Sequence, residues 1–162
     1  MSDTVSVAIA LGSNLGDRRE NIDYALSALS LDVAEMKVSA IVDTAPVGVG
    51  EEHKPYLNAV VVGLTRLPSR DLLERLLEIE DERGRLRPYP MAPRTLDLDL
   101  ILYGNSVVED PGLSVPHPRF RERVFVLAPL AEVAPEMIDP VTGRSIAQLL
   151  SALFVAKSDD RI

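Results

Sequence analysis

Two strand-like segments follow each other with no helix between them, and this order constrains the fold more than any other feature of the chain. The apolar patterns of residues 36–43 and 56–64 each predict a strand. Residues 45–54 between them contain a proline and two glycines, which predicts a loop. Strands joined directly by a loop favour an antiparallel pair, because parallel strands need a longer crossover connection.

Helical patterns flank this pair of strands. Asp17 followed by Glu20 fits the start of a helix, and the apolar residues after it recur at helical spacing. A second helix is predicted from Pro68 and Ser69 to Gly84, with a stripe of leucines on one face. The pair of strands is therefore expected to lie between two helices along the chain.

Outer strands are predicted before the first helix and after the second, at residues 5–11 and 96–102. The order β-α-β-β-α-β predicts an α+β fold of the ferredoxin-like type, in which helices pack on an antiparallel sheet. The C-terminal additions are a turn and short strand at 104–108, an irregular stretch at 111–118, and helices at 120–133 and 146–154. We expect residues 1–162 to form one domain.

Charge and composition exclude several classes of function. The formal net charge of −8 argues against binding to nucleic acid or anionic membranes, which needs a basic surface. The absence of cysteine excludes disulfides, thiolate metal sites and thiol catalysis. No apolar run reaches the length of a membrane-spanning helix, and the N-terminus lacks the pattern of a signal peptide. A cytoplasmic protein is expected, with no obligate protein partner.

A pair of aspartates carries the strongest indication of chemistry. In the strand after Arg94, apolar residues alternate with Asp97 and Asp99. Residues two apart share one face of a strand, about 6.6–6.8 Å apart along the backbone. Two such carboxylates can hold Mg²⁺, which binds one or two carboxylates together with substrate phosphates. The alternative is an amphipathic strand whose acidic face is solvated.

Basic residues gather near that strand. Eight arginines lie in two groups, at 83, 85, 87 and 94 and at 119, 121, 123 and 144. Their planar guanidinium groups suit bidentate phosphate contacts, although any one of them could be an ordinary surface residue. His117, between two prolines, is either a phosphate-contacting donor or a structural residue. Residues 84–93, rich in proline and arginine, predict a loop that closes over a substrate and excludes water.

Two further positions leave alternatives open. Tyr56 and Asn58 share a strand face, where a ring beside an amide could hold a flat heterocycle or could belong to the core and the strand end. Glu80 continues the stripe of Leu72 and Leu76, and a buried carboxylate is costly unless it is paired. The alternative for Glu80 is a last helical turn that has emerged into water.

Residues 93–101 resemble the characteristic motif of 6-hydroxymethyl-7,8-dihydropterin pyrophosphokinases. Supporting motifs occur in order along nearly the whole chain, at residues 11–16, 44–46, 56–59, 80 with 84–85, and 115–117. The resemblance implies the same ferredoxin-like fold. It also implies an enzyme of folate biosynthesis that transfers pyrophosphate from ATP to the hydroxymethyl group of a reduced pterin and releases AMP.

The resemblance implies a role for each site residue. Catalytic residues would be Asp97, Asp99, Arg85, Arg94 and His117, with two Mg²⁺ ions on the aspartates. The nucleotide would contact Glu80, Arg85, Arg94, His117 and Arg123. The pterin would contact Thr44, Val47, Tyr56, Asn58 and Phe125, with the two aromatic rings on either side of it.

The chain departs from better-known members of that family in two places. It has no tryptophan in the loop before the motif, where Tyr89 or Met91 stands instead, and Pro118 replaces a tyrosine. Two other functions remain open on the same fold, namely a non-catalytic pterin- or nucleotide-binding protein and an acidic metal-binding module. The combination of Asp97, Asp99 and His117 with the arginines favours the enzyme.

Overall fold

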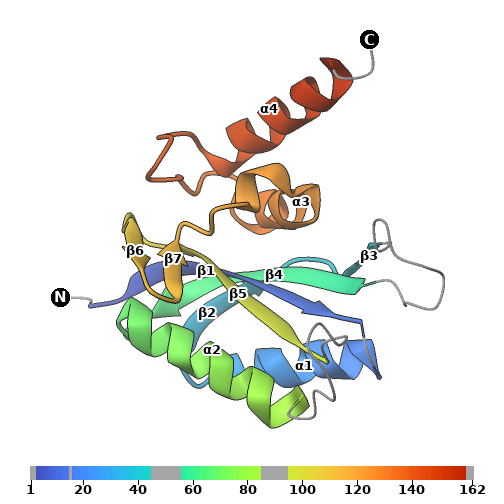
Figure 1. Ribbon diagram of the computed structural model, residues 1–162, viewed down its shortest axis with the longest axis vertical. Helices are drawn as coiled ribbons and strands as arrows, with labels where there is room; N and C mark the ends of the chain where they lie inside the picture. Colours follow the sequence, from blue (N-terminus) through green and yellow to red (C-terminus); the bar gives the residue numbers. More distant parts are fainter. Residues whose placement is uncertain (1–2, 15, 45–55, 85–94, 160–162) are drawn as a thin grey trace.

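A five-stranded antiparallel sheet forms the middle layer of the molecule in a computed structural model that describes residues 3–14, 16–44, 56–84 and 95–159 (Figure 1). The strands lie in the order β2-β4-β1-β5, and β3 pairs with the other end of β4. The elements of this layer and its first two helices are β1 (Val5–Ser13), α1 (Arg18–Leu29), β2 (Val33–Val38), β3 (Val42–Thr44), β4 (Tyr56–Thr65), α2 (Ser69–Gly84) and β5 (Asp97–Tyr103).

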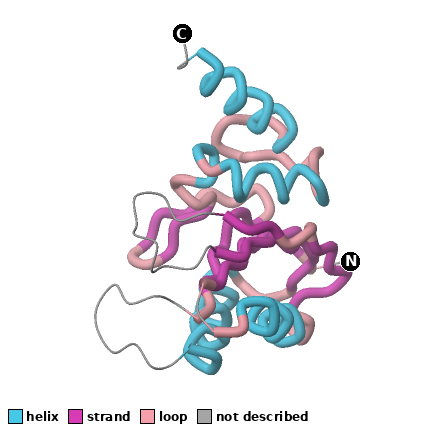
Figure 2. The backbone as a smooth tube through the Cα atoms, turned by 90° about the vertical axis from the view of Figure 1, so that its right-hand side faces the viewer, coloured by secondary structure: helices cyan, strands magenta, loops and turns pink. Residues whose placement is uncertain are grey.

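The remaining elements follow β5 along the chain. They are β6 (Val108–Asp110), β7 (Leu113–Val115), a 3-10 turn η1 (Phe120–Glu122), α3 (Val124–Val133) and α4 (Ile146–Asp159). Helices α1 and α2 lie on one side of the sheet, and α3 with α4 lies on the other, as the turned view of Figure 2 also shows. No helix within the described ranges is long and apolar enough to cross a membrane.

Each face of the sheet contributes to its own hydrophobic core. Val7, Ile9 and Leu11 of β1 pack with α1 and α2, whereas Ala8 packs with Val60 and the residues of α3 and α4. Because both faces are covered, β1 reads as a continuous apolar run and not as a simple alternation. The predicted α+β architecture with an antiparallel sheet is confirmed.

The predicted strand at 36–43 is wrong in extent. The chain forms β2 at Val33–Val38 and a separate β3 at Val42–Thr44. Between them the buried Ser39 bonds to Val60 twice, since its N–H donates to the Val60 carbonyl and its hydroxyl accepts from the Val60 N–H, each at 2.9 Å. A side-chain oxygen thus takes the place of a backbone carbonyl, and the regular ladder is interrupted there.

Two further expectations after β5 need correction. Residues 111–118 are not irregular throughout, because Leu113–Val115 pairs with Val108–Asp110 in a hairpin. The predicted helix at 120–133 is divided, because Arg123 has an extended backbone between η1 and α3. β6, β7 and η1 are each three residues long, which is too short for periodicity to reveal.

Candidate functional site

The pairing register places the predicted site residues side by side at one end of the sheet. Strand β1 lies between β4 and β5, and Gly12 pairs with Asn58 on one side and with Asp97 on the other. Ala10, two residues earlier, pairs with Asp99. Because neighbouring strands are about 4.8 Å apart, the backbones of Asn58 and Asp97 lie roughly 10 Å apart across the glycine. These side chains share the face that α3 covers.

Gly12, the middle residue of this row, carries no side chain on the face that α3 covers. A Cβ atom at Gly12 would meet Asn58 Oδ1 at 3.4 Å and Tyr56 Cδ1 at 3.6 Å. The ring and the amide predicted as a heterocycle slot therefore adjoin the space above Gly12. Asn58 is 9% exposed and Tyr56 is half-buried. Both side chains thus lie close to Gly12, next to the strand that carries the acidic pair.

His117 is fixed next to β5 by two hydrogen bonds. Its backbone N–H donates to the Ile101 carbonyl at 2.9 Å, and its Nδ1 accepts from the Arg119 N–H at 3.1 Å. Since Nδ1 is an acceptor, the proton of the neutral ring is on Nε2, which becomes the free donor. Burial lowers the pKa of His117; Asp99 opposes this effect, and Arg123 and Arg119 add to it. The net effect favours the neutral ring, in which Nε2–H is the donor.

Glu80 supports the acidic strand from the opposite face of the sheet. The side chain is 8% exposed, and its Oε2 accepts from the backbone N–H of Leu98 at 2.7 Å. Leu98 stands between Asp97 and Asp99, and its side chain belongs to the core under α1 and α2. Of the two alternatives for Glu80, the buried and paired carboxylate is correct.

A second buried group anchors the residues just before β5. Asn21 and Ser13, both almost fully buried, bond to the carbonyl oxygen of Thr95, and Arg83 at the end of α2 donates to Asn21. The sequence interpretation missed Asn21. Its position four residues before the buried Ala25 on α1 was a signal, because a polar residue on a core-facing stripe needs partners.

The segment that follows His117 is attached to the turn before α4. Arg121 donates to Asp139 from Nε at 2.6 Å and from a terminal nitrogen at 2.9 Å. Asp139 is fully buried and also accepts from the Val141 N–H and the Thr142 hydroxyl. Burial alone would raise the pKa of the Asp139 carboxyl, but the hydrogen bonds and the charge of Arg121 hold it below its usual range.

This attachment positions the first residues of α3. Phe125 is exposed at the start of the helix, and the Arg123 guanidinium lies 5.8 Å from the centre of its ring. The predicted pterin-stacking ring and a predicted nucleotide contact therefore lie together. Sequence reasoning found both residues but missed the Arg121–Asp139 pair behind them, since its members are 18 residues apart in sequence.

Some predicted site residues cannot be placed. Arg85, Arg94 and Val47 lie outside the described residues, as do Tyr89 and Met91 and most of the predicted loop at 84–93. Thr44 ends β3, where its backbone pairs with Tyr56. The roles assigned to these positions stay predictions.

The donor set suits a cation that shares its ligands with a substrate. Within the described residues, no group of three or more histidine, aspartate or glutamate side chains could enclose a metal. Asp97 and Asp99 supply two carboxylates from one strand face. Mg²⁺ commonly binds one or two carboxylates and completes its octahedron with phosphate oxygens and water, so the pair fits Mg²⁺ held together with a nucleotide.

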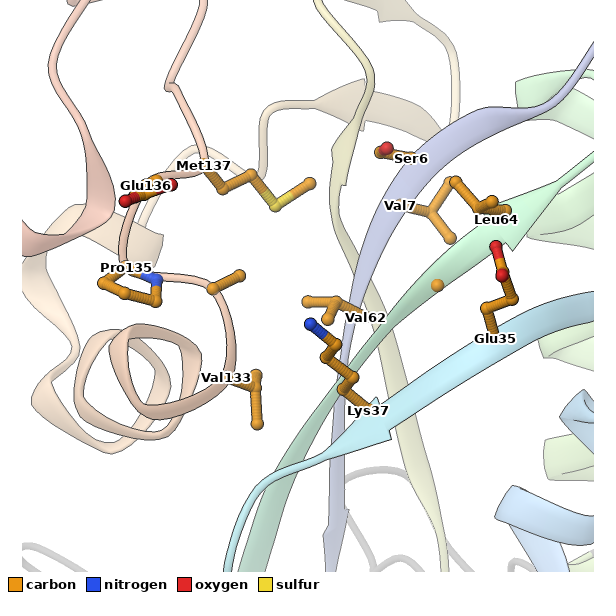
Figure 3. Close-up of a pocket in the computed structure, with 12 residues that line it drawn as sticks. Ser6, Val7, Glu35, Lys37, Val62, Leu64, Val133, Pro135, Glu136 and Met137 are labelled. Atoms are coloured by element: carbon orange, nitrogen blue, oxygen red, sulfur yellow. The ribbon is translucent and has the colours of Figure 1, made fainter.

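A separate hollow of about 640 Å³ lies near the opposite end of the sheet. Figure 3 shows Lys37 and Val62 of the sheet facing Val133 and Met137 at the end of α3 and just beyond it. Ser6 and Leu64, which pair in the register, also line it. Among the residues that the structure describes, none that the sequence assigned to the site lines this hollow.

Comparison with known proteins decides the family. The model of the 7,8-dihydro-6-hydroxymethylpterin-pyrophosphokinase (HPPK) family matches residues 8–135. The chain belongs to this family. The HPPK segment thus extends from β1 to the end of α3 and contains every described residue that the sequence assigned to the site.

Relatives of known name agree with the HPPK assignment. The 2-amino-4-hydroxy-6-hydroxymethyldihydropteridine pyrophosphokinase of Bacillus subtilis is 43% identical over 142 residues, covering 86% of this chain and 84% of that protein. The protein of the same name from Pseudomonas aeruginosa is 40% identical over 148 residues, covering 90% of each.

A solved structure supports the fold. Wild-type HPPK-DHPS of Plasmodium falciparum matches with a TM-score of 0.74 at 13% identity. The match covers 98% of this chain but only 46% of the Plasmodium chain. At that identity the likeness supports the ferredoxin-like HPPK fold alone.

Proposed function

We propose that this chain transfers the pyrophosphate group of ATP to 6-hydroxymethyl-7,8-dihydropterin, giving AMP and the pterin pyrophosphate, a step of folate biosynthesis. The observation that carries the proposal is the row Asn58, Gly12 and Asp97 across three adjacent strands. It sets a ring-and-amide slot about 10 Å from a carboxylate pair, so that one ligand can bridge the two.

The slot suits the pterin. Tyr56 and Phe125 would stack on the two faces of the flat ring, and the Asn58 amide would form hydrogen bonds with the polar atoms at its edge. Bound in this way, the hydroxymethyl group would extend over Gly12 toward Asp97. The main-chain groups from Thr44 to Val47 are proposed to add contacts at the ring edge, as the family resemblance implies.

The acidic end suits the triphosphate. Asp97 and Asp99 would hold Mg²⁺, which supplies charge neutralisation and polarises the phosphoryl oxygens. The Nε2–H of His117 would donate to a phosphate oxygen without adding a charge. We propose that phosphate is bound by Arg123, Arg85 and Arg94. Glu80 would hold the backbone of β5 from the side of the sheet that α2 covers.

The reaction is a displacement at the β-phosphorus of ATP. The pterin hydroxyl oxygen forms the new bond to that phosphorus, the bond to the oxygen bridging the α- and β-phosphates breaks, and AMP leaves with that oxygen. The hydroxyl proton passes to Asp97 or to a water molecule at the site. Positioning and charge stabilisation supply most of the catalysis of such transfers.

We also propose that residues 1–162 form one domain. Ile146 and Leu149 of α4 share a buried cluster with Val126 and Leu130 of α3, which supports this assignment beyond the segment that matches the family.

One assay tests the function. The protein is incubated with ATP, Mg²⁺ and 6-hydroxymethyl-7,8-dihydropterin, and nucleotides are separated by chromatography. AMP that forms only when the pterin is present supports the proposal. ADP as the product contradicts it, and tight binding of both ligands without AMP identifies a non-catalytic binding protein on the same fold.

A further inference from the structure

A buried asparagine joins three elements at the end of the sheet that carries the acidic pair. Asn21 of α1 is 3% exposed. Its Nδ2 donates to Ser13 Oγ at 3.0 Å and to the Thr95 carbonyl at 3.2 Å, and its Oδ1 accepts from Arg83 Nε at 2.7 Å. One side chain therefore connects the end of β1, the last turn of α2 and the residue two positions before Asp97.

The chemistry of the partners fixes the orientation of the amide. The guanidinium of Arg83 can only donate, and the carbonyl of Thr95 can only accept. A flipped amide would therefore face donors with a donor and an acceptor with an acceptor. Ser13 completes the arrangement, because its hydroxyl donates to the Thr95 carbonyl at 2.6 Å while it accepts from Asn21.

Hydrogen bonds thereby hold the backbone at the start of β5 at two residues, Thr95 and Leu98. The Thr95 carbonyl is held by Asn21 and Ser13, and the Leu98 N–H is held by Glu80 of α2. Asp97 lies between these points. The direction of the backbone at Asp97 thus depends on hydrogen bonds made on the side of the sheet opposite to the site.

The same asparagine links the two ends of the helix-to-strand connection. Arg83 is in the last turn of α2, and Thr95 comes shortly before β5. Arg83 is partly exposed, and its guanidinium also lies 5.0 Å from the centre of the Tyr24 ring. Contacts from α1 therefore fix where α2 ends relative to where β5 begins.

We propose that Asn21 is a positioning residue for the pyrophosphate transfer, which sets the placement of Asp97 and Asp99 by tying Thr95 to Arg83 and Ser13. The inference rests on the proposed function. Asn21 lies beneath the sheet and acts through the backbone, so its loss changes the geometry of the carboxylates and leaves their number unchanged. A displacement of about 1 Å remote from the reacting atoms can lower a rate by up to about 100-fold.

Steady-state kinetics of four variants test the inference. Asn21→Leu removes every bond of the amide, and Asn21→Asp keeps the acceptor for Arg83 but sets a carboxylate against the Thr95 carbonyl. Each should lower kcat by roughly 10- to 100-fold, with the KM of both substrates changed less than about threefold. Arg83→Leu should lower kcat less, and Arg83→Lys, which keeps a donor, should restore most of it. Arg19→Leu, an exposed arginine of the same helix α1, is the matched control.

Amide hydrogen exchange of the free protein gives a readout that does not depend on turnover. Asn21→Leu should accelerate exchange of the Leu98 N–H, because the Thr95 carbonyl then keeps only its bond from Ser13 and the start of β5 is held less firmly. Arg19→Leu should leave it unchanged. Rates are compared at a temperature well below the melting temperature of each variant, so that global unfolding does not contribute.

The outcomes separate this inference from the proposed function. A wild-type chain that forms AMP, with unchanged kcat and unchanged Leu98 exchange in Asn21→Leu, overturns the inference alone. A lower melting temperature with unchanged kcat also overturns it, since the role would then be purely structural. A wild-type chain that forms no AMP overturns the proposed function and the inference with it.

Discussion

Glu80 of α2 accepts a 2.7 Å hydrogen bond from the backbone N–H of Leu98, the residue between the two aspartates of the site. Replacing Glu80 by leucine leaves this buried N–H without an acceptor. The free energy of unfolding should fall by about 1–3 kcal/mol, whereas Glu80→Gln, which keeps an oxygen acceptor, should lose less. Urea denaturation measures both, with the exposed Glu74→Leu on the same helix as control. Equal losses in the leucine and glutamine variants would contradict the assigned bond.

Asp97→Ala and Asp99→Ala should nearly abolish AMP formation. Both lose a carboxylate that would hold Mg²⁺, and such a loss of several kcal/mol corresponds to more than about 100-fold in rate. Melting temperatures measured with EDTA should change little. Asp110→Ala, an exposed aspartate of β6, is the control and should keep full activity. Near-normal turnover in both site variants would contradict the assignment of Asp97 and Asp99 as Mg²⁺ ligands.

Tyr56→Ala and Phe125→Ala should weaken pterin binding. Stacking of a flat heterocycle on an aromatic ring contributes roughly 1–3 kcal/mol, so affinity should fall by about 10- to 100-fold. Calorimetry with a pterin analogue and an unreactive ATP analogue measures the change. Phe154→Ala, an exposed ring on α4, should have no effect. If pterin affinity were unchanged in both variants, the two rings would have to be assigned to packing.

Gly12→Ala should raise the KM of the pterin by about tenfold, because a methyl group would fill the slot that the ligand needs. The new Cβ would lie 3.4 Å from Asn58 Oδ1 and 3.6 Å from Tyr56 Cδ1, which the fold tolerates. Gly63→Ala is the contrasting variant, since its Cβ would lie 2.5 Å from Val33 Cγ1. Gly63→Ala should reduce the stability of the protein and leave the KM of the pterin unchanged. The prediction fails if both alanines behave alike.

Asp139→Asn should lower the free energy of unfolding by about 1–3 kcal/mol at pH 7, because it breaks the ion pair between the buried Asp139 and the partly exposed Arg121. The pKa of Asp139 is lowered on folding, so the unfolded chain binds the proton more readily. Its contribution is therefore present above the unfolded pKa of about 4 and is lost as the pH falls through the lower folded pKa. The difference between wild type and variant should shrink below pH 4. Denaturation curves across pH 3–7 would show this, and a constant difference would exclude the linkage.

The features that could be predicted from the sequence are those that depend on local residue patterns. Alternation along β5 placed Asp97 and Asp99 on one face, and the element order predicted the antiparallel sheet that the structure confirms. The register could not be predicted, because pairing of Gly12 with both Asn58 and Asp97 depends on strands from three parts of the chain. Local propensity carries no information about such long-range alignment.

The supporting contacts of the site were also beyond the sequence. The helical spacing of Asn21 hints at burial, but the partners of Asn21 and Asp139 are brought together only by folding. Glu80 was ambiguous for a related reason. A carboxylate on an apolar stripe indicates a buried partner, but only the packing of α2 under β5 shows that the partner is a backbone N–H.

Gly12 lies on a central strand that pairs with β4 on one side and β5 on the other, so the sheet fixes the spacing between Asn58 and Asp97. A site bounded only by loops could widen or narrow by a loop movement, whereas the spacing here is set by the sheet. A ligand that spans the row from Asn58 to Asp97 would therefore meet a distance that no loop movement adjusts, and its length would have to match the strand spacing.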